Sequence, residues 1–156
     1  MLKKVMIGVL TTAMVATGAS IAAAGSEDDG DDDGHVIHLT ARTANEGQVD
    51  TPPSGPSTGD RFVFSEDLFR NGDRVGRDAG ECVIAEAQGE SATVNCVATL
   101  ELPGGQITVQ GLVDFADPQP PFTIAVTGGT GRYRDADGEL TIVEAGDTDR
   151  FTIRLD

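Results

Sequence analysis

From His35 onward, the sequence is divided into short runs of alternating apolar and polar side chains, and this pattern most limits the possible folds. Alternation places successive side chains on opposite faces of a β-strand, so Ile37, Leu39 and Ala41 share one face of the first run. No segment keeps a helical period. The predicted strands span residues 35–42, 61–69, 80–87, 92–102, 106–115, 122–126, 139–144 and 149–155. Eight short strands separated by turn residues predict one all-β domain, a sandwich or a barrel, over residues 35–156.

The N-terminus resembles a secretory signal peptide. Lys3 and Lys4 precede an apolar stretch over residues 5–16, and the small residues 22–24 fit an A-x-A cleavage pattern. The apolar stretch is shorter than the ~20 residues that a membrane span needs, although an uncleaved anchor is the alternative. We therefore predict a signal peptide at residues 1–24 and a secreted protein. The Asp- and Gly-rich stretch 25–34 has nothing to bury and is expected to be a disordered acidic tail.

The chain is strongly acidic, with a formal net charge of −15 at pH 7. Both lysines lie in the predicted signal peptide, so the remaining domain has no lysine. A surface of this sign repels phosphate backbones and anionic lipids, which argues against nucleic-acid partners and against membrane binding after signal cleavage.

The two cysteines, Cys82 and Cys96, lie at mirror positions about Gly89 in a predicted hairpin. Residues at such positions face each other on adjacent antiparallel strands, within reach of a disulfide. Exported proteins meet an oxidising compartment, which favours the bond. Two free thiols in the core are the alternative.

Two further patterns could indicate a ligand, and neither supports one. His35 and His38 resemble a His-x-x-His metal pair, but on a strand this spacing places them on opposite faces. The glycines of the segment 128–131 resemble a phosphate loop, but no Lys-Ser or Lys-Thr and no βαβ unit accompanies them. We expect neither a metal nor a cofactor.

Four motifs occur in a distinctive order. They are Gly59-Asp60 at a strand opening, Val75-Gly76 followed by Ala79-Gly80-Glu81-Cys82, Gly105-Gln106-Ile107-Thr108-Val109-Gln110-Gly111, and Gly128-Gly129-Thr130-Gly131-Arg132-Tyr133 with Ala136-Asp137-Gly138. Together they resemble the barrel shared by allene oxide cyclases and dirigent proteins. The resemblance implies an eight-stranded antiparallel up-and-down barrel, a homotrimer, and an apolar cavity that binds a hydrophobic small molecule. It also implies cofactor-independent cyclisation or isomerisation guided by shape; a non-catalytic carrier or structural barrel is the alternative.

The same resemblance suggests the site residues. His38 and Glu66 correspond to polar positions near the reacting centre and are the catalytic candidates. Phe64, Cys82 and Tyr133 are the candidates for contacts with the ligand. This sequence departs from the family at two further positions: position 113 is Val where the cyclases carry Tyr, and Asp137 replaces the Arg of the dirigent Ala-Arg-Gly pattern.

Overall fold

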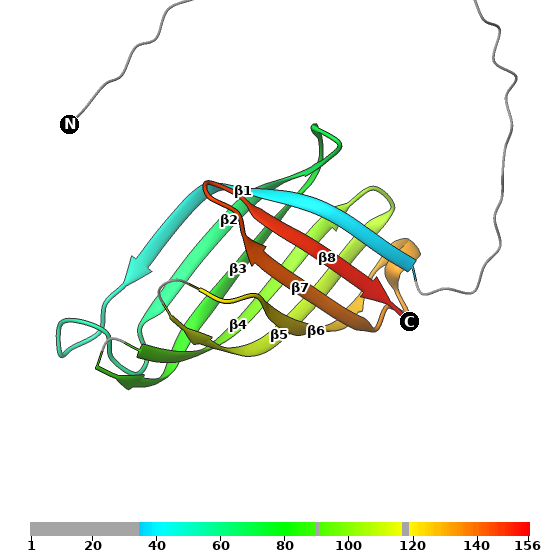
Figure 1. The fold of residues 1–156 in the computed structure, drawn as a ribbon. Coiled ribbons are helices and arrows are strands. Elements are labelled where there is room, and N and C mark those ends of the chain that lie inside the picture. Colours follow the sequence, from blue (N-terminus) through cyan, green and yellow to red (C-terminus); the bar gives the residue numbers. More distant parts are fainter. Residues whose placement is uncertain (1–34, 90, 117–118) are drawn as a thin grey trace, which may run out of the picture. The chain divides into compact units, whose positions relative to one another are not determined.

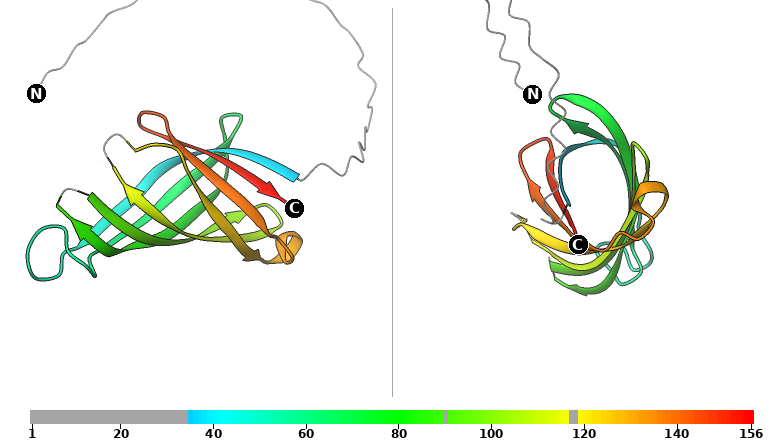
Figure 2. Two further views of the ribbon diagram at one scale, coloured as in Figure 1. Left: turned by 60° about the horizontal axis from the view of Figure 1, so that its bottom comes forward. Right: turned by 90° about the vertical axis from the view of Figure 1, so that its right-hand side faces the viewer.

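The computed structural model describes residues 35–89, 91–116 and 119–156, so the predicted signal peptide and acidic tail lie outside the described residues. Eight antiparallel strands form a closed barrel in sequence order, with the last strand pairing with the first (Figure 1). The strands are β1 (His35–Val49), β2 (Arg61–Arg70), β3 (Asp73–Gln88), β4 (Ser91–Leu102), β5 (Gly105–Phe115), β6 (Phe122–Gly129), β7 (Gly138–Glu144) and β8 (Asp149–Leu155). The end-on view in Figure 2 shows the ring of strands. The predicted up-and-down barrel is confirmed.

Strands β3 and β1 extend furthest beyond the ranges that the sequence predicts. Strand β3 begins at Asp73 rather than at residue 80, because Asn71 (φ 53°) and Gly72 (φ 91°) form a tight turn that leads directly into the next strand. Strand β1 continues beyond its predicted end at residue 42 to Val49, and a register shift between Thr43 and Asn45 bends it.

The two ends of the barrel are filled differently. At the end where β1 begins and β8 finishes, inward-facing Leu68, Ile107 and Ile153 are fully buried and pack the interior. The 3-10 helix η1 (Gly131–Tyr133) lies at this end between β6 and β7, with Tyr133 buried. We call this the closed end. At the opposite end, where β1 finishes and β2 begins, interior side chains such as Phe115 remain partly exposed, and we call it the open end.

Asp60 fastens the loop between β1 and β2 to the barrel. Its carboxylate is buried and accepts hydrogen bonds from the backbone N–H groups of Thr51 (2.8 Å) and Ser57 (2.9 Å) and from both hydroxyl groups (2.7 and 3.1 Å). Its own carbonyl accepts a bond from the N–H of Ile84 in β3 (2.9 Å). The Gly-Asp motif is therefore an anchor for a loop.

Within the described part of the chain, no helix is long and apolar enough to cross a membrane.

Candidate functional site

The interior of the barrel contains a cavity of about 780 Å³, which we call the central cavity. Its walls are mostly apolar and come from all eight strands. The aromatic side chains in the wall are Phe62, Phe64, Phe115, Phe122 and Phe151. Phe62 and Phe115 meet edge to face near the open end, with ring centroids 6.1 Å apart. The volume falls within the range of small-molecule sites, about 300–1,000 Å³.

Phe64 can lie against its wall because Gly80 stands opposite it on β3. A Cβ atom at position 80 would lie 2.7 Å from the Phe64 ring and 2.4 Å from the carbonyl oxygen of Val97, so any larger residue would displace both strands. The glycine therefore leaves room for the ring. Phe64, Gly80 and Ala98 face each other across three neighbouring strands and shape one wall.

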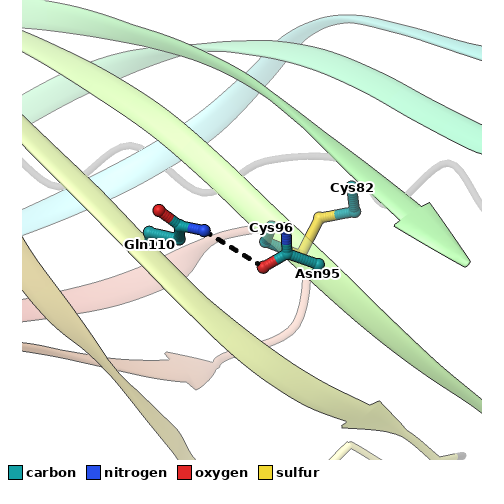
Figure 3. The surroundings of a disulfide bond; sticks show 4 residues. All are labelled: Cys82, Asn95, Cys96 and Gln110. Carbon is teal, nitrogen blue, oxygen red and sulfur yellow. Dashed lines mark hydrogen bonds between the residues drawn. A yellow bond between two sulfur atoms is a disulfide. The ribbon is translucent and has the colours of Figure 1, made fainter. Parts of the chain in front are cut away.

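A disulfide links the next pair of residues on the same wall. Cys82 and Cys96 are cross-strand partners with Cα atoms 4.0 Å apart, and their sulfur atoms are bonded (Figure 3). The sequence-based disulfide is confirmed. Both residues line the cavity, while neighbouring Asn95 accepts a hydrogen bond from Gln110 (3.5 Å). Oxidation makes Cys82 part of a fixed wall rather than a free thiol.

Two carboxyl groups form the floor of the cavity on β2 and β3. Glu66 and Asp78 are cross-strand partners, with 8% and 2% of their surfaces exposed. Both line the cavity, whereas Leu68, the next inward-facing residue of β2 toward the closed end, is fully buried and does not. We call Glu66 and Asp78 the carboxyl pair.

The pair holds a proton near neutral pH. Burial, followed by repulsion from Glu66, raises the pKa of Asp78 to about 8, and the Asp78 carboxyl is hydrogen-bonded to that of Glu66. Burial and the charge of Asp149 also raise the pKa of Glu66. Two buried carboxyl groups in contact cannot both ionise cheaply, so they share one proton.

Other acidic side chains reach the cavity from the neighbouring strands. Asp149 on β8 lies beside Glu144 on β7, and burial together with the charge of Glu144 raises the pKa of Asp149. Glu46 on β1 is the fifth carboxyl group of the wall. The cavity thus has an apolar body and acidic groups contributed by five strands.

The structure brings together three of the five residues that sequence reasoning selected as catalytic or ligand-binding. Glu66, Phe64 and Cys82 line the central cavity. His38 does not: its exposed side chain lies on the outer face of β1, with Nδ1 3.4 Å from the hydroxyl of Thr152. Tyr133 is buried at the closed end, with Arg132 over its ring, and is not part of the cavity wall.

Sequence reasoning missed Asp78 and Asp149 as site residues. Asp78 fell outside the predicted strand, and only the early start of β3 places it opposite Glu66. Asp149 carried a usable signal, because it keeps the alternation of Phe151, Ile153 and Leu155 on the buried face of β8.

Similar solved structures include a demethylase, a Diels-Alderase and a dirigent protein. A pyocyanin demethylase is 30% identical, with a TM-score of 0.71, over 78% of this chain and 100% of that one. The exo-specific intermolecular Diels-Alderase AbnU is 18% identical, with a TM-score of 0.64, over 78% of this chain and 96% of that one. The pterocarpan synthase dirigent protein GePTS1 is 13% identical, with a TM-score of 0.54, over 86% of this chain and 94% of that one.

No curated protein matches the chain. The family described as "Allene oxide cyclase barrel like domain" matches residues 36–155, which is nearly the whole described barrel. The closed eight-stranded topology agrees with the fold that the four sequence motifs imply. This chain belongs to the allene oxide cyclase barrel-like family.

Proposed function

We propose that this protein is a secreted barrel that binds a hydrophobic small molecule in its central cavity and guides the cyclisation or isomerisation of that molecule by shape. The observation that carries the proposal is the open, largely apolar cavity of about 780 Å³. A structural barrel would fill this space with side chains, as the closed end does. Secretion is supported by the signal-like N-terminus and by the disulfide.

The chemistry we assign to the protein is orientation assisted by one proton. Aromatic and aliphatic walls hold a flexible ligand in a reactive conformation, which lowers the entropic part of the barrier. The carboxyl pair at the floor retains a proton near neutral pH and serves as a hydrogen-bond donor or general acid to a polar atom of the ligand. The small-molecule reactions in the names of the similar structures are consistent with this role.

The first experiment measures binding of a neutral fluorescent probe, N-phenylnaphthylamine, whose emission rises in apolar surroundings. We expect saturable binding to the wild type and loss of binding in Ala98→Phe, because Ala98 lies on the cavity wall. Ala125→Phe, the same enlargement at an exposed position on β6, is the matched control and should bind normally. Phe64→Ala, which removes a wall side chain without overpacking, should weaken binding.

Absence of saturable binding to the wild type, or equal binding to folded Ala98→Phe, would overturn the proposal. A non-catalytic carrier would bind the probe equally well. The two functions are separated by incubating the protein with the molecule that co-purifies with it and following conversion by mass spectrometry. A guiding enzyme converts the molecule and slows in Asp78→Asn, whereas a carrier returns it unchanged.

The homotrimer that the family resemblance implies remains part of the proposal. Native mass spectrometry of the purified domain tests it directly, because a trimer and a monomer differ threefold in mass.

A further inference from the structure

All the described ionisable side chains that line the central cavity are acidic. Its ionisable side chains are Glu46, Glu66, Asp78, Glu144 and Asp149, and among the described residues that line it there is no Lys, Arg or His. The arginines of the neighbouring strands lie on the outside. Arg74 and Arg77, for example, pair with Asp67 and Glu101 on the outer face. The interior acids therefore have no protein cation as a partner within the cavity wall.

Asp78 also has an unused hydrogen-bonding atom. Only 2% of the surface of Asp78 is accessible to solvent, and its side-chain oxygen Oδ1 has no hydrogen-bond partner. Natural structures rarely leave a buried acceptor unpaired, because desolvation is then uncompensated. Asp78 lines the cavity beside Glu66, so a donor group or a positive charge on a ligand at the cavity floor would offset the desolvation of this oxygen.

The shape of the site favours an organic ligand over a metal ion. Across the described ranges, no group of three His, Cys, Asp or Glu side chains is arranged to hold a metal. The carboxyl groups are instead spread over five strands around an apolar space bounded by Phe64, Phe122 and Phe151. The ring system of an organic ligand would pack against these walls, and a positively charged face or edge of that ligand would contact the carboxyl groups.

We propose that the central cavity selects hydrophobic organic cations, that is, aromatic or alicyclic molecules carrying a basic or permanently charged nitrogen, with the nitrogen directed at the carboxyl pair. The proposal rests on the proposed function, because it names the class of molecule that the cavity binds. It does not require that the molecule is converted.

Cation binding is coupled to loss of the shared proton. The charge of Asp149 acts on both members of the pair, and the remaining acids of the wall, Glu144 and Glu46, are exposed; all are acidic, so an incoming positive charge relieves the repulsion and the proton leaves to the buffer. The affinity for a permanent cation therefore increases as pH rises through the pKa of Asp78, about 8. The affinity for a neutral molecule of the same shape stays constant over that range.

The test uses three tricyclic probes of nearly equal size, namely N-methylacridinium, anthracene and anthroate, which are cationic, neutral and anionic. Fluorescence titration of the full domain near pH 8 should give the tightest binding for N-methylacridinium, about tenfold tighter than anthracene if the charge is worth about one pKa unit. Anthroate should bind most weakly. Asp78→Asn and Glu66→Gln should lower the ratio of the N-methylacridinium affinity to the anthracene affinity.

Attraction to the acidic surface is controlled by Glu139→Gln, which removes a carboxylate from an exposed position of β7. Glu139→Gln should keep the full preference for N-methylacridinium over anthracene. If none of the three probes binds, the proposed function itself fails. If anthracene binds as tightly as N-methylacridinium, or if Asp78→Asn and Glu139→Gln keep the preference equally, only the selection of cations is overturned.

Discussion

Two buried aspartates show how the same side chain is used in opposite ways within one barrel. Asp60 and Asp78 are both almost fully inaccessible to solvent and begin from the same ordinary pKa of 3.8. Hydrogen bonds from the Thr51 backbone and side chain, followed by those from Ser57, lower the pKa of Asp60 to about 2. Asp78 has an unpaired oxygen and an acidic neighbour, and burial raises its pKa to about 8.

Hydrogen-bond donors, rather than depth of burial, therefore decide what a buried carboxyl group does in this barrel. Asp60 is surrounded by N–H and O–H groups from a loop, so its charge is stabilised and it holds that loop in place. Asp78 faces an open cavity with few donors, so it keeps a proton and retains an acceptor for a ligand. The first is structural, and the second marks the candidate site.

The largest expected effect is on stability when Asp60 is replaced. Asp60→Ala leaves four donors of Thr51 and Ser57 without their acceptor, so the thermal midpoint should fall by roughly 5–10 °C for a domain of this size. Circular dichroism melts provide the measurement. Asp50→Ala in the same loop is the control, because Asp50 is exposed and accepts only one long bond, 3.5 Å from Gly55. Equal midpoints for the two variants would show that Asp60 is not an anchor.

An intermediate effect is expected in the pH dependence of unfolding. The raised pKa of Asp78 means that its contribution to stability is fully present below its unfolded pKa and is lost as pH rises through about 8. Asp78→Asn removes this loss, so near pH 9 the variant should be more stable than the wild type by about 1 kcal/mol. The lowered pKa of Asp60 works in the reverse direction, with stability lost as pH falls through about 2.

Urea unfolding at several pH values measures both the loss of stability at acid pH and the loss at alkaline pH. The matched variant Asp60→Asn should no longer show the loss at acid pH and should keep the loss at alkaline pH. A wild type whose stability rises steadily from neutral to alkaline pH would contradict the assignment to Asp78.

The smallest expected effect concerns a titratable residue outside both environments. His38 lies on the outer face of β1, so His38→Ala should change the affinity for N-phenylnaphthylamine by less than about twofold, as expected for a surface substitution. Fluorescence titration checks this. A large loss of affinity would mean that the site extends to the outside of the barrel and that the contrast between the two aspartates does not define it.

The sequence predicts the fold well because strand alternation is a local signal. Ile37, Leu39 and Ala41 are buried as the pattern indicates, and the mirror positions of Cys82 and Cys96 correctly predict the disulfide. The same alternation assigns His38 to the outer face, because it lies between buried neighbours. The family correspondence alone suggested it as a catalytic candidate.

The candidate site is harder to predict because it depends on register between strands. Glu66 and Asp78 become neighbours only when the Asn71-Gly72 turn pairs β2 with an extended β3, and that extension begins before the apolar alternation of β3 becomes clear. The role of Asp60 similarly depends on a loop folding back onto it. Such tertiary contacts leave no periodic trace in the sequence.

The most direct test of the contrast between the two aspartates is carbon NMR of the domain labelled at its aspartate carboxyl groups, followed through a pH titration. We predict that the Asp60 carboxyl titrates near pH 2 and that of Asp78 near pH 8, with the Asp78 signal assigned by its loss in Asp78→Asn. If Asp78 titrates in the ordinary range near its usual pKa of 3.8, the account of a proton-holding floor in the central cavity is wrong.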